Sequence, residues 1–195
     1  MTTLYSGDDL VYIWMRGDGS IGLVNPNTLT SNVVTNFFGA PHESVSPFTA
    51  IASPRENKVL GLDVKDGVVM FVFLRSDQGI VRKPQSDCLG DTGTVLCMET
   101  STDDNIFFAG GSSQFELMKG VAKIFCMTFD EDVDLICDLT LPNNIVNTSG
   151  VSDIKRKPGT DVLFCGANAS LFVVEWTGSH FVILTQVEEI HSCKF

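Results

Sequence analysis

The sequence predicts an all-β protein made of short antiparallel strands, and three observations lead to that class. Short runs rich in Val, Ile, Phe and Thr recur along the 195 residues, as is typical of strands. The 17 glycines and 7 prolines fall mostly between these runs, where turns need them. No stretch keeps the apolar spacing of an amphipathic helix for more than about ten residues. We therefore expect helix in less than about a tenth of the chain, well below the usual third.

The expected strands form four sets of four, separated by polar turns. The first two sets comprise Thr2–Ser6, Leu10–Met15, Ser20–Val24 and Ser31–Asn36, then Phe48–Ser53, Val59–Val64, Val68–Leu74 and Ile80–Lys83. The last two sets comprise Thr94–Thr100, Ile106–Ala109, Val121–Phe129 and Leu135–Leu141, then Val151–Lys155, Val162–Gly166, Leu171–Trp176 and Phe181–Val187. Each run has the length and the β-branched or aromatic content of a strand, and Gly, Pro, Asn, Asp or Ser bounds it.

The sets repeat one another weakly. The second strands of the last three sets begin Val59-Leu60-Gly61, Ile106-Phe107-Phe108 and Val162-Leu163-Phe164, and the third strands are the most apolar. Equivalent positions in the first strands, such as Ile51, Met98 and Ile154, recur with a period of roughly 40–55 residues. A repeat of this length that contains four strands is typical of a β-propeller blade.

In this rhythm the chain resembles the WD-repeat β-propeller superfamily over essentially its whole length. The Gly-His and Trp-Asp pairs of that family are missing; the third strands end Thr128-Phe129-Asp130 and Glu175-Trp176-Thr177, so the subfamily stays open. The resemblance implies a single propeller-like domain or half-propeller over 1–195. Its blades are expected at about 2–45, 46–92, 93–150 and 151–190, and 191–195 would open a further strand. Four blades suggest part of a larger ring, completed by further blades of the same polypeptide or by a partner.

Charge and composition limit the partners. The formal net charge is −11 and the pI is about 4.5, which disfavours nucleic acid and anionic membrane surfaces as partners. The first residues show no signal-peptide pattern, and no apolar run approaches the roughly 18 residues of a membrane-spanning helix. We expect a cytoplasmic protein, with a nuclear location as the alternative.

The six cysteines stand at positions 88, 97, 126, 137, 165 and 193. They form no Cys-x-x-Cys motif, so neither a zinc ribbon nor a thioredoxin-type site is indicated. Most lie inside apolar runs, where a reduced cysteine behaves as a small hydrophobic residue. We expect all six to be reduced, because disulfides are rare in the cytosol.

Several motifs imitate known sites but lack the context that those sites need. The Gly17–Gly22 segment matches G-x-G-x-x-G, yet Pro26 stands where a dinucleotide-binding helix would run, so Asp18-Gly19 indicates a hairpin turn instead. The same turn holds Arg16-Gly17-Asp18, the tripeptide that integrins read in extracellular ligands. The acidic stretch 130–134 opens like a calcium loop but lacks the required Gly and Glu.

No catalytic or metal motif stands out. There is no G-x-S-x-G, and the histidines at 42, 180 and 191 show no ligand spacing. We therefore expect no cofactor, no metal and no enzymatic activity. The one basic cluster, Lys155-Arg156-Lys157, fits a solvated turn or a contact for an acidic segment of a partner.

The remaining candidate is a surface of loops. In a propeller the loops between second and third strands share one face with those between blades. The residues expected to bind a protein partner there are Phe37, Phe38, Phe115, Met118, Asp18 and Asp66. Large apolar side chains on a loop favour an interaction site, although the loop 110–120 could also fold back and bury them.

We expect a non-enzymatic protein-interaction scaffold, a propeller module in a multiprotein complex. The alternative is the N-terminal half of a propeller enzyme or ligand-binding propeller whose active residues lie outside this chain. Open strand edges also favour self-association.

Replacing Phe115 and Met118 together by Ala should weaken partner binding by about 2 kcal/mol, because apolar anchors dominate interface energies. The free energy of unfolding should change by less than about 1 kcal/mol, as for surface positions. Calorimetric titration and urea denaturation measure the two quantities. Unfolding of the double variant would place these side chains in the core.

Overall fold

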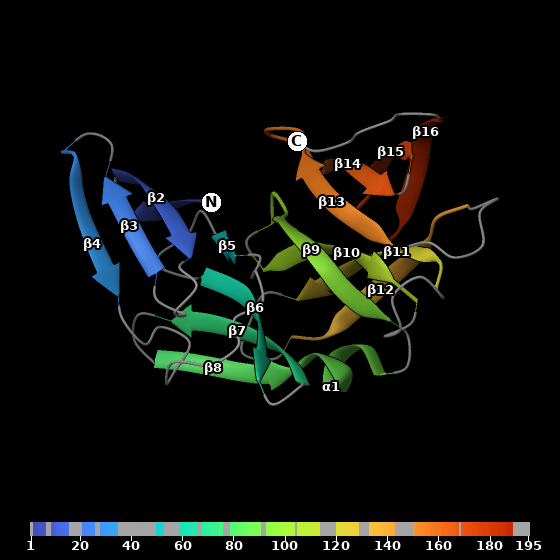
Figure 1. Ribbon diagram of the computed structural model, residues 1–195. Helices are drawn as coiled ribbons and strands as arrows, with labels where there is room; N and C mark the ends of the chain where they lie inside the picture. Colours follow the sequence, from blue (N-terminus) through green and yellow to red (C-terminus); the bar gives the residue numbers. More distant parts are fainter. Residues whose placement is uncertain are drawn as a thin grey trace. The chain divides into compact units, whose positions relative to one another are not determined.

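A computed structural model describes residues 2–6, 9–15, 21–25, 28–34, 50–52, 59–65, 68–75, 79–90, 93–103, 105–113, 120–128, 133–142, 150–167 and 169–188. These residues form an all-β structure of four-stranded antiparallel sheets with one short helix (Figure 1). The expectation of an all-β protein with very little helix is confirmed. The chain divides into two compact units, Met1–Gln85 and Ser86–Phe195, which are described separately.

The first unit contains two sheets whose strands follow one another in chain order. The first sheet consists of β1 (Thr2–Ser6), β2 (Asp9–Met15), β3 (Ile21–Asn25) and β4 (Thr30–Val34). The second consists of β5 (Ala50–Ala52), β6 (Val59–Lys65), β7 (Val68–Arg75) and β8 (Gly79–Pro84). Phe71 on β7 is fully buried, in keeping with the strongly apolar run that predicted this strand.

The second unit repeats the plan. Its first sheet consists of β9 (Thr94–Thr100), β10 (Ile106–Ser112), β11 (Ala122–Thr128) and β12 (Leu135–Thr140). Its second consists of β13 (Val151–Arg156), β14 (Val162–Ala167), β15 (Ser170–Trp176) and β16 (Phe181–Val187). Within each sheet, every strand pairs antiparallel with the next one in the chain, as short connections between strands allow.

One element was not predicted from the sequence. The helix α1 (Gln85–Leu89) has five residues, too few to show the helical period on which prediction depends. Leu89 is buried, and Gly90 follows with φ 54°. Glycine adopts this left-handed conformation readily, and it commonly ends a helix.

The two sheets of the second unit pack face to face. The β9–β12 sheet contributes Phe108, Ile124 and Cys126 to the shared core, and the β13–β16 sheet contributes Leu163 and Phe172 among others. An aromatic cluster lies in this core: the ring centroids of Phe108 and Trp176 are 6.3 Å apart, those of Phe108 and Phe181 5.9 Å, and those of Trp176 and Phe181 5.0 Å. Tilted and edge-on pairs at these distances add to the hydrophobic stabilisation.

Glycines permit close approach where the two sheets meet. A Cβ on Gly110 would lie 2.5 Å from Val151 Cγ1 and 2.6 Å from Cys97 Sγ, both well inside van der Waals contact. Gly150, just before β13, has φ 88° and approaches the Gly111 carbonyl. The chain therefore needs glycine at this junction for both space and backbone conformation.

A polar cluster joins the turns of the same two sheets. The Asp161 carboxylate accepts hydrogen bonds from Ser101 Oγ at 2.9 Å, Thr102 N at 2.6 Å and Thr102 Oγ1 at 2.7 Å. Arg156 donates through Nε to the Thr100 carbonyl at 2.7 Å and through Nη1 to the Thr160 carbonyl at 3.0 Å. We call these five residues with Asp161 the turn clamp; it holds the β9–β10 turn against the β13–β14 turn.

Replacing Asp161 with Ala should lower the free energy of unfolding by about 2 kcal/mol, because three donors lose a charged acceptor. Asp138, whose carboxylate pairs with Lys123 on the sheet surface, provides the matched control. Its replacement with Ala should cost no more than about 1 kcal/mol, as for exposed ion pairs. Urea denaturation measures both. Equal losses from the two variants would show that the turn clamp does not hold the sheets together.

Candidate interaction face

The six residues expected to bind a partner lie outside the described residues. This holds for Asp18, Phe37, Phe38, Asp66, Phe115 and Met118, so their role stays a prediction. Most of the G-x-G-x-x-G segment, most of the acidic stretch and the strand expected at 191–195 also lie outside. The basic cluster Lys155–Lys157 is described, at the end of β13 and the start of the following turn.

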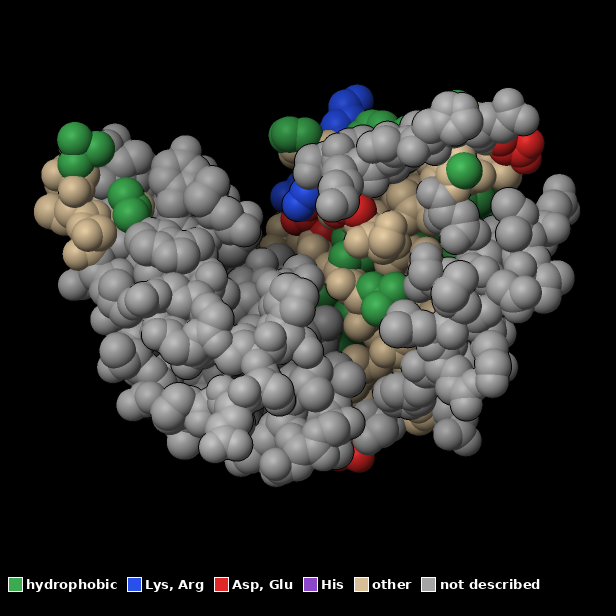
Figure 2. Space-filling model, viewed as in Figure 1, with side chains coloured by type: hydrophobic (Ala, Val, Ile, Leu, Met, Phe, Trp, Pro, Cys, Tyr) green, Lys and Arg blue, Asp and Glu red, His purple; other side chains and the backbone are tan. Residues whose placement is uncertain are grey.

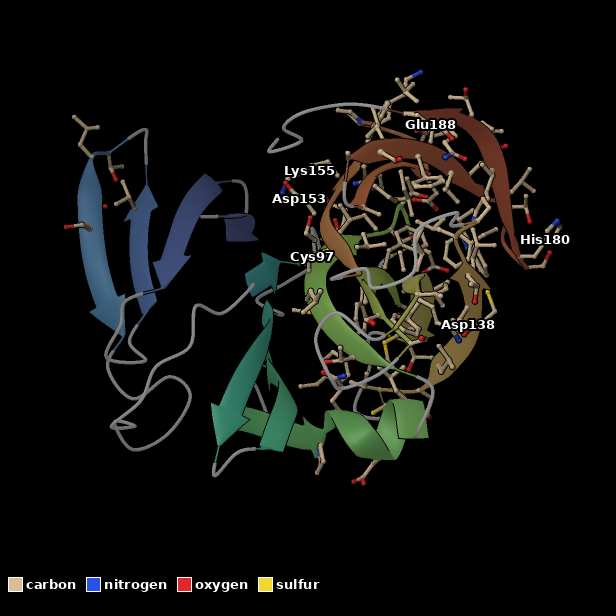
Figure 3. All side chains as sticks on the ribbon, turned by 45° about the vertical axis from the view of Figure 1, so that its right-hand side comes forward. Cys97, Asp138, Asp153, Lys155, His180 and Glu188 are labelled. Atoms are coloured by element: carbon tan, nitrogen blue, oxygen red, sulfur yellow. The ribbon has the colours of Figure 1, made fainter. Side chains whose placement is uncertain are left out.

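Other chemistry-bearing residues of the described part form no reactive group. His180 lies in the β15–β16 turn, where Thr177 Oγ1 is 3.1 Å and Ser179 Oγ 3.0 Å from its Nδ1. Figure 3 shows His180 and Glu188 at opposite ends of β16. Within the described ranges, no three His, Cys, Asp or Glu side chains gather as metal ligands would. No helix there is long and apolar enough to cross a membrane.

The last sheet has two different faces. Its inner face, formed by residues such as Leu163, Cys165, Phe172, Val174 and Trp176, is buried in the shared core. On the opposite side, strand pairing places Phe164 next to Val173, Leu171 next to Val187, and Glu175 between Val162 and Val182. We call the apolar residues of this side the outer face: Val162, Phe164, Leu171, Val173, Val182 and Val187.

The outer face is apolar yet accessible to solvent. Val162, Phe164, Leu171 and Val173 are only half-buried, and Val182 and Val187 are 37% and 45% exposed. Leu184, at the irregularity between these two residues on β16, is 51% exposed. Hydrophobic side chains reach the surface beside basic ones in this unit (Figure 2). Adjacent exposed apolar side chains are more informative than scattered ones, because they mark interaction sites.

The preceding sheet shows what such a face does when it is covered. Phe108 pairs with Cys126 across β10 and β11 in the same way that Phe164 pairs with Val173 across β14 and β15. Phe108 and Cys126 are 0% exposed because the inner face of the β13–β16 sheet packs on them. The outer face therefore repeats, in similar residues, a surface whose central residues Phe108, Ile124 and Cys126 are completely buried one sheet earlier.

Charged residues flank the outer face. Lys155 and Asp153 stand on β13 opposite Phe164 and Gly166, and Figure 3 shows both near Cys97. Glu175 lies on β15, and Lys157 is exposed in the turn. The position of Lys155 corresponds to Glu99 in the preceding sheet, since Glu99 stands opposite Phe108. The charge at this position is thus opposite in the two sheets.

Three cysteines of the second unit, Cys97, Cys126 and Cys165, are buried in its core. Cys97 Sγ lies 3.4 Å from the Val151 carbonyl and 3.7 Å from the Gly110 carbonyl. Burial, aided by the Asp153 charge, raises the pKa of the Cys97 thiol to about 12. Burial also raises the pKa of Cys165. The pKa of Cys126 is raised to about 12, mainly by burial and also by the neighbouring Cys137. Thiols with such raised pKa values are poor nucleophiles.

Comparisons with known proteins support the fold and leave the function open. No protein-family model matches the chain, and no curated protein does. Among solved structures, it is similar to the crystal structure of a functionally unknown protein from Desulfotomaculum acetoxidans, with 11% sequence identity and a TM-score of 0.52. The match covers 95% of this chain and 58% of that one. Our chain thus spans little more than half the length of this structural neighbour.

In the native protein at pH 8, Cys97 and Cys165 should resist alkylation by iodoacetamide, because burial raises the pKa of both thiols. With a pKa of about 12, Cys97 is ionised to only about one part in ten thousand. Cys88, which is half-exposed, should react first. Peptide mass mapping measures each site, and alkylation in urea without reductant should label all six cysteines. Rapid labelling of Cys97 in the native protein would contradict its place in the core.

Proposed function

We propose that this protein is a non-enzymatic interaction scaffold of the β-propeller type, and that the outer face of its β13–β16 sheet binds another protein. The observation that carries the proposal is the contrast between Phe108 and Phe164. Phe108 and Phe164 stand at equivalent positions on equivalent faces, but Phe108 is fully buried and Phe164 only partly.

The energetics favour an occupied outer face. Fully burying a side chain of the size of Val, Leu or Phe is worth about 1.5–3 kcal/mol. The outer face holds six such side chains, each partly or largely exposed. A partner that covers them gains apolar contacts with Lys155 and Lys157 at the rim, and an apolar centre with a charged rim is the usual anatomy of a protein interface.

Four-stranded sheets in sequence order, and the packing of the β9–β12 sheet on the β13–β16 sheet, also support the propeller arrangement. The acidic composition also supports a role in protein binding. The net charge of −11 favours partners with basic surfaces, and it limits nonspecific association between copies. A cytoplasmic scaffold of this kind would present successive sheets and loops to several proteins at once.

Replacing Val182 with Asp should weaken binding of partners by about 2 kcal/mol, or roughly 30-fold, because it places a second carboxylate beside Glu175 on a face that would bury apolar side chains. Ile136 is the matched control: it is 45% exposed on β12, the last strand of the neighbouring sheet. Affinity capture followed by calorimetry with the purified partners would compare wild type, Val182→Asp and Ile136→Asp.

Partners should be lost with Val182→Asp and kept with Ile136→Asp, while thermal unfolding of both variants stays close to that of the wild type. Identical partner sets and affinities for the two variants would show that the outer face is not the binding surface.

A further inference from the structure

Two cysteines stand directly opposite each other on the last strand pair of the β9–β12 sheet. Cys126 on β11 pairs with Cys137 on β12, which is an edge strand of that sheet. Directly opposite residues of an antiparallel pair project to the same face, and both thiols do so here, since Cys126 belongs to the shared core and Cys137 packs against it. The pair lies on a different sheet from the outer face, so its chemistry is independent of the proposed function.

The hydrogen-bond ladder sets the distance between these two residues. Leu141 N donates to the Ala122 carbonyl at 2.9 Å, which makes Ala122 and Leu141 a hydrogen-bonded pair. Such pairs alternate with non-hydrogen-bonded ones, and the register continues without a shift as far as Cys126 and Cys137. The two cysteines therefore form a hydrogen-bonded pair, whose Cα atoms stand about 5.5 Å apart. Disulfides most often join Cα atoms about 5.5–6 Å apart.

An irregularity of the ladder lies beside the cysteine pair. Met127 pairs with Leu135, so Ile136 is an extra residue on β12, and a strand bends at such a bulge. Opposite Cβ atoms lie about 4.5–5.5 Å apart in a sheet and about 3.5–4.5 Å apart in a disulfide. A movement of β12 by about 1 Å at its bulge therefore brings the two sulfurs within bonding distance.

The two thiols differ in access. Cys126 is 0% exposed, whereas Cys137 is half-buried on the edge strand. Burial and then the Cys137 charge raise the pKa of Cys126 to about 12, and burial and then the Asp138 charge raise the pKa of Cys137. These raised pKa values keep both groups as thiols and slow their reaction with external reagents. Of the two, only Cys137 can meet an external disulfide, and Cys126 reacts with a sulfur that is already bonded to Cys137.

We propose that Cys126 and Cys137 are a dithiol that a small disulfide of the glutathione type oxidises reversibly to a cross-strand disulfide, and that this bond fastens β12 to β11. The Cys137 thiolate attacks one sulfur of the external disulfide and releases the first small thiol, which leaves a mixed disulfide on Cys137. The Cys126 thiolate then attacks the Cys137 sulfur and releases the second small thiol. Two protein thiols are oxidised and one external disulfide is reduced to two thiols, so electrons and protons balance. An excess of the small thiol reverses both steps.

Proximity compensates for the high pKa of Cys126. Its thiolate is rare, but a thiolate of high pKa is intrinsically a strong nucleophile, and the mixed disulfide holds the Cys137 sulfur beside it. Groups positioned in this way react as if at concentrations far above those of a dissolved thiol. The reversibility of the bond agrees with a reducing compartment, where disulfides are usually transient.

Peptide mapping after treatment with glutathione disulfide tests the proposal. The native 195-residue chain is reduced, freed of reductant, incubated with glutathione disulfide, quenched in acid and alkylated in urea. Trypsin cleaves after Lys123 and Lys155, so Cys126 and Cys137, and no other cysteine, lie on the peptide 124–155. A disulfide between them lowers the mass of this peptide by two hydrogen atoms and leaves it unalkylated, whereas a mixed disulfide adds glutathione.

We expect the loss of two hydrogens in the wild type, its reversal by reduced glutathione, and glutathione retained on Cys137 in the Cys126→Ser variant. The matched control, Cys137→Ser with Leu139→Cys, moves the thiol two positions along the same face of β12, opposite Ile124. It should retain glutathione, because diagonal neighbours lie about 7–8 Å apart.

Free thiols or retained glutathione in the wild type, a bond from Cys137 to any other cysteine, or an equal disulfide yield in the control would each overturn the proposal. The wild-type mass decides between these outcomes even where a variant does not fold.

Hydrogen exchange measures the fastening of β12. In the described part of the chain this strand is bonded to its sheet on one side only, and weakly held elements open locally more often than core strands. The β12 amides should exchange about tenfold more slowly in the oxidised chain than in the reduced chain, while those of β15 should change little. Equal exchange of β12 in the two forms would refute the fastening of this strand by the disulfide.

Discussion

A sheet whose strands are apolar on both sides must be covered on both sides, and the second unit depends on this requirement. The β9–β12 sheet carries Phe107 and Phe125 on one face and Phe108 and Ile124 on the other, and all four are fully buried. The β13–β16 sheet supplies the cover for the second of these faces. Because hydrophobic burial is the largest favourable term in folding, this contact determines which faces of the two sheets meet.

The polar groups refine that contact. Apolar packing alone leaves sliding and rotation of one sheet over the other relatively unconstrained, whereas hydrogen bonds are directional. Asp161 and Arg156 join the two turns at one end of the junction. At the other end of the junction, Gly110 and Gly150 leave room for Val151 and for the Gly111 carbonyl, so that the two sheets can approach. Orientation and spacing are therefore set by separate groups, and the aromatic cluster fills the remaining space.

Most of the fold could be predicted because strands and turns are local. The runs Thr2–Ser6, Thr94–Thr100 and Phe181–Val187 coincide with β1, β9 and β16. The clearest differences between expected and observed elements have physical reasons. The strand β10 extends to Ser112, beyond the expected end at Ala109, because the two glycines that follow resemble a turn. The helix α1 has only five residues, too few to show a helical period. The candidate site was predicted only in part. The basic cluster was noted, but Val182 and Phe164 gave no signal of exposure.

The sequence by itself determined the class of structure, the number of strands in each described sheet and their order, since alternating apolar runs and turn residues specify these over a few positions. Only the tertiary structure decided which face of each sheet is covered. Phe108 and Phe164 have similar neighbours in the sequence, yet one is completely buried and the other half-exposed. The partnership of Asp161 with Ser101, 60 positions away, was equally beyond local reasoning. Burial and such contacts depend on what packs against a residue from elsewhere in the chain, and no local pattern records that neighbour.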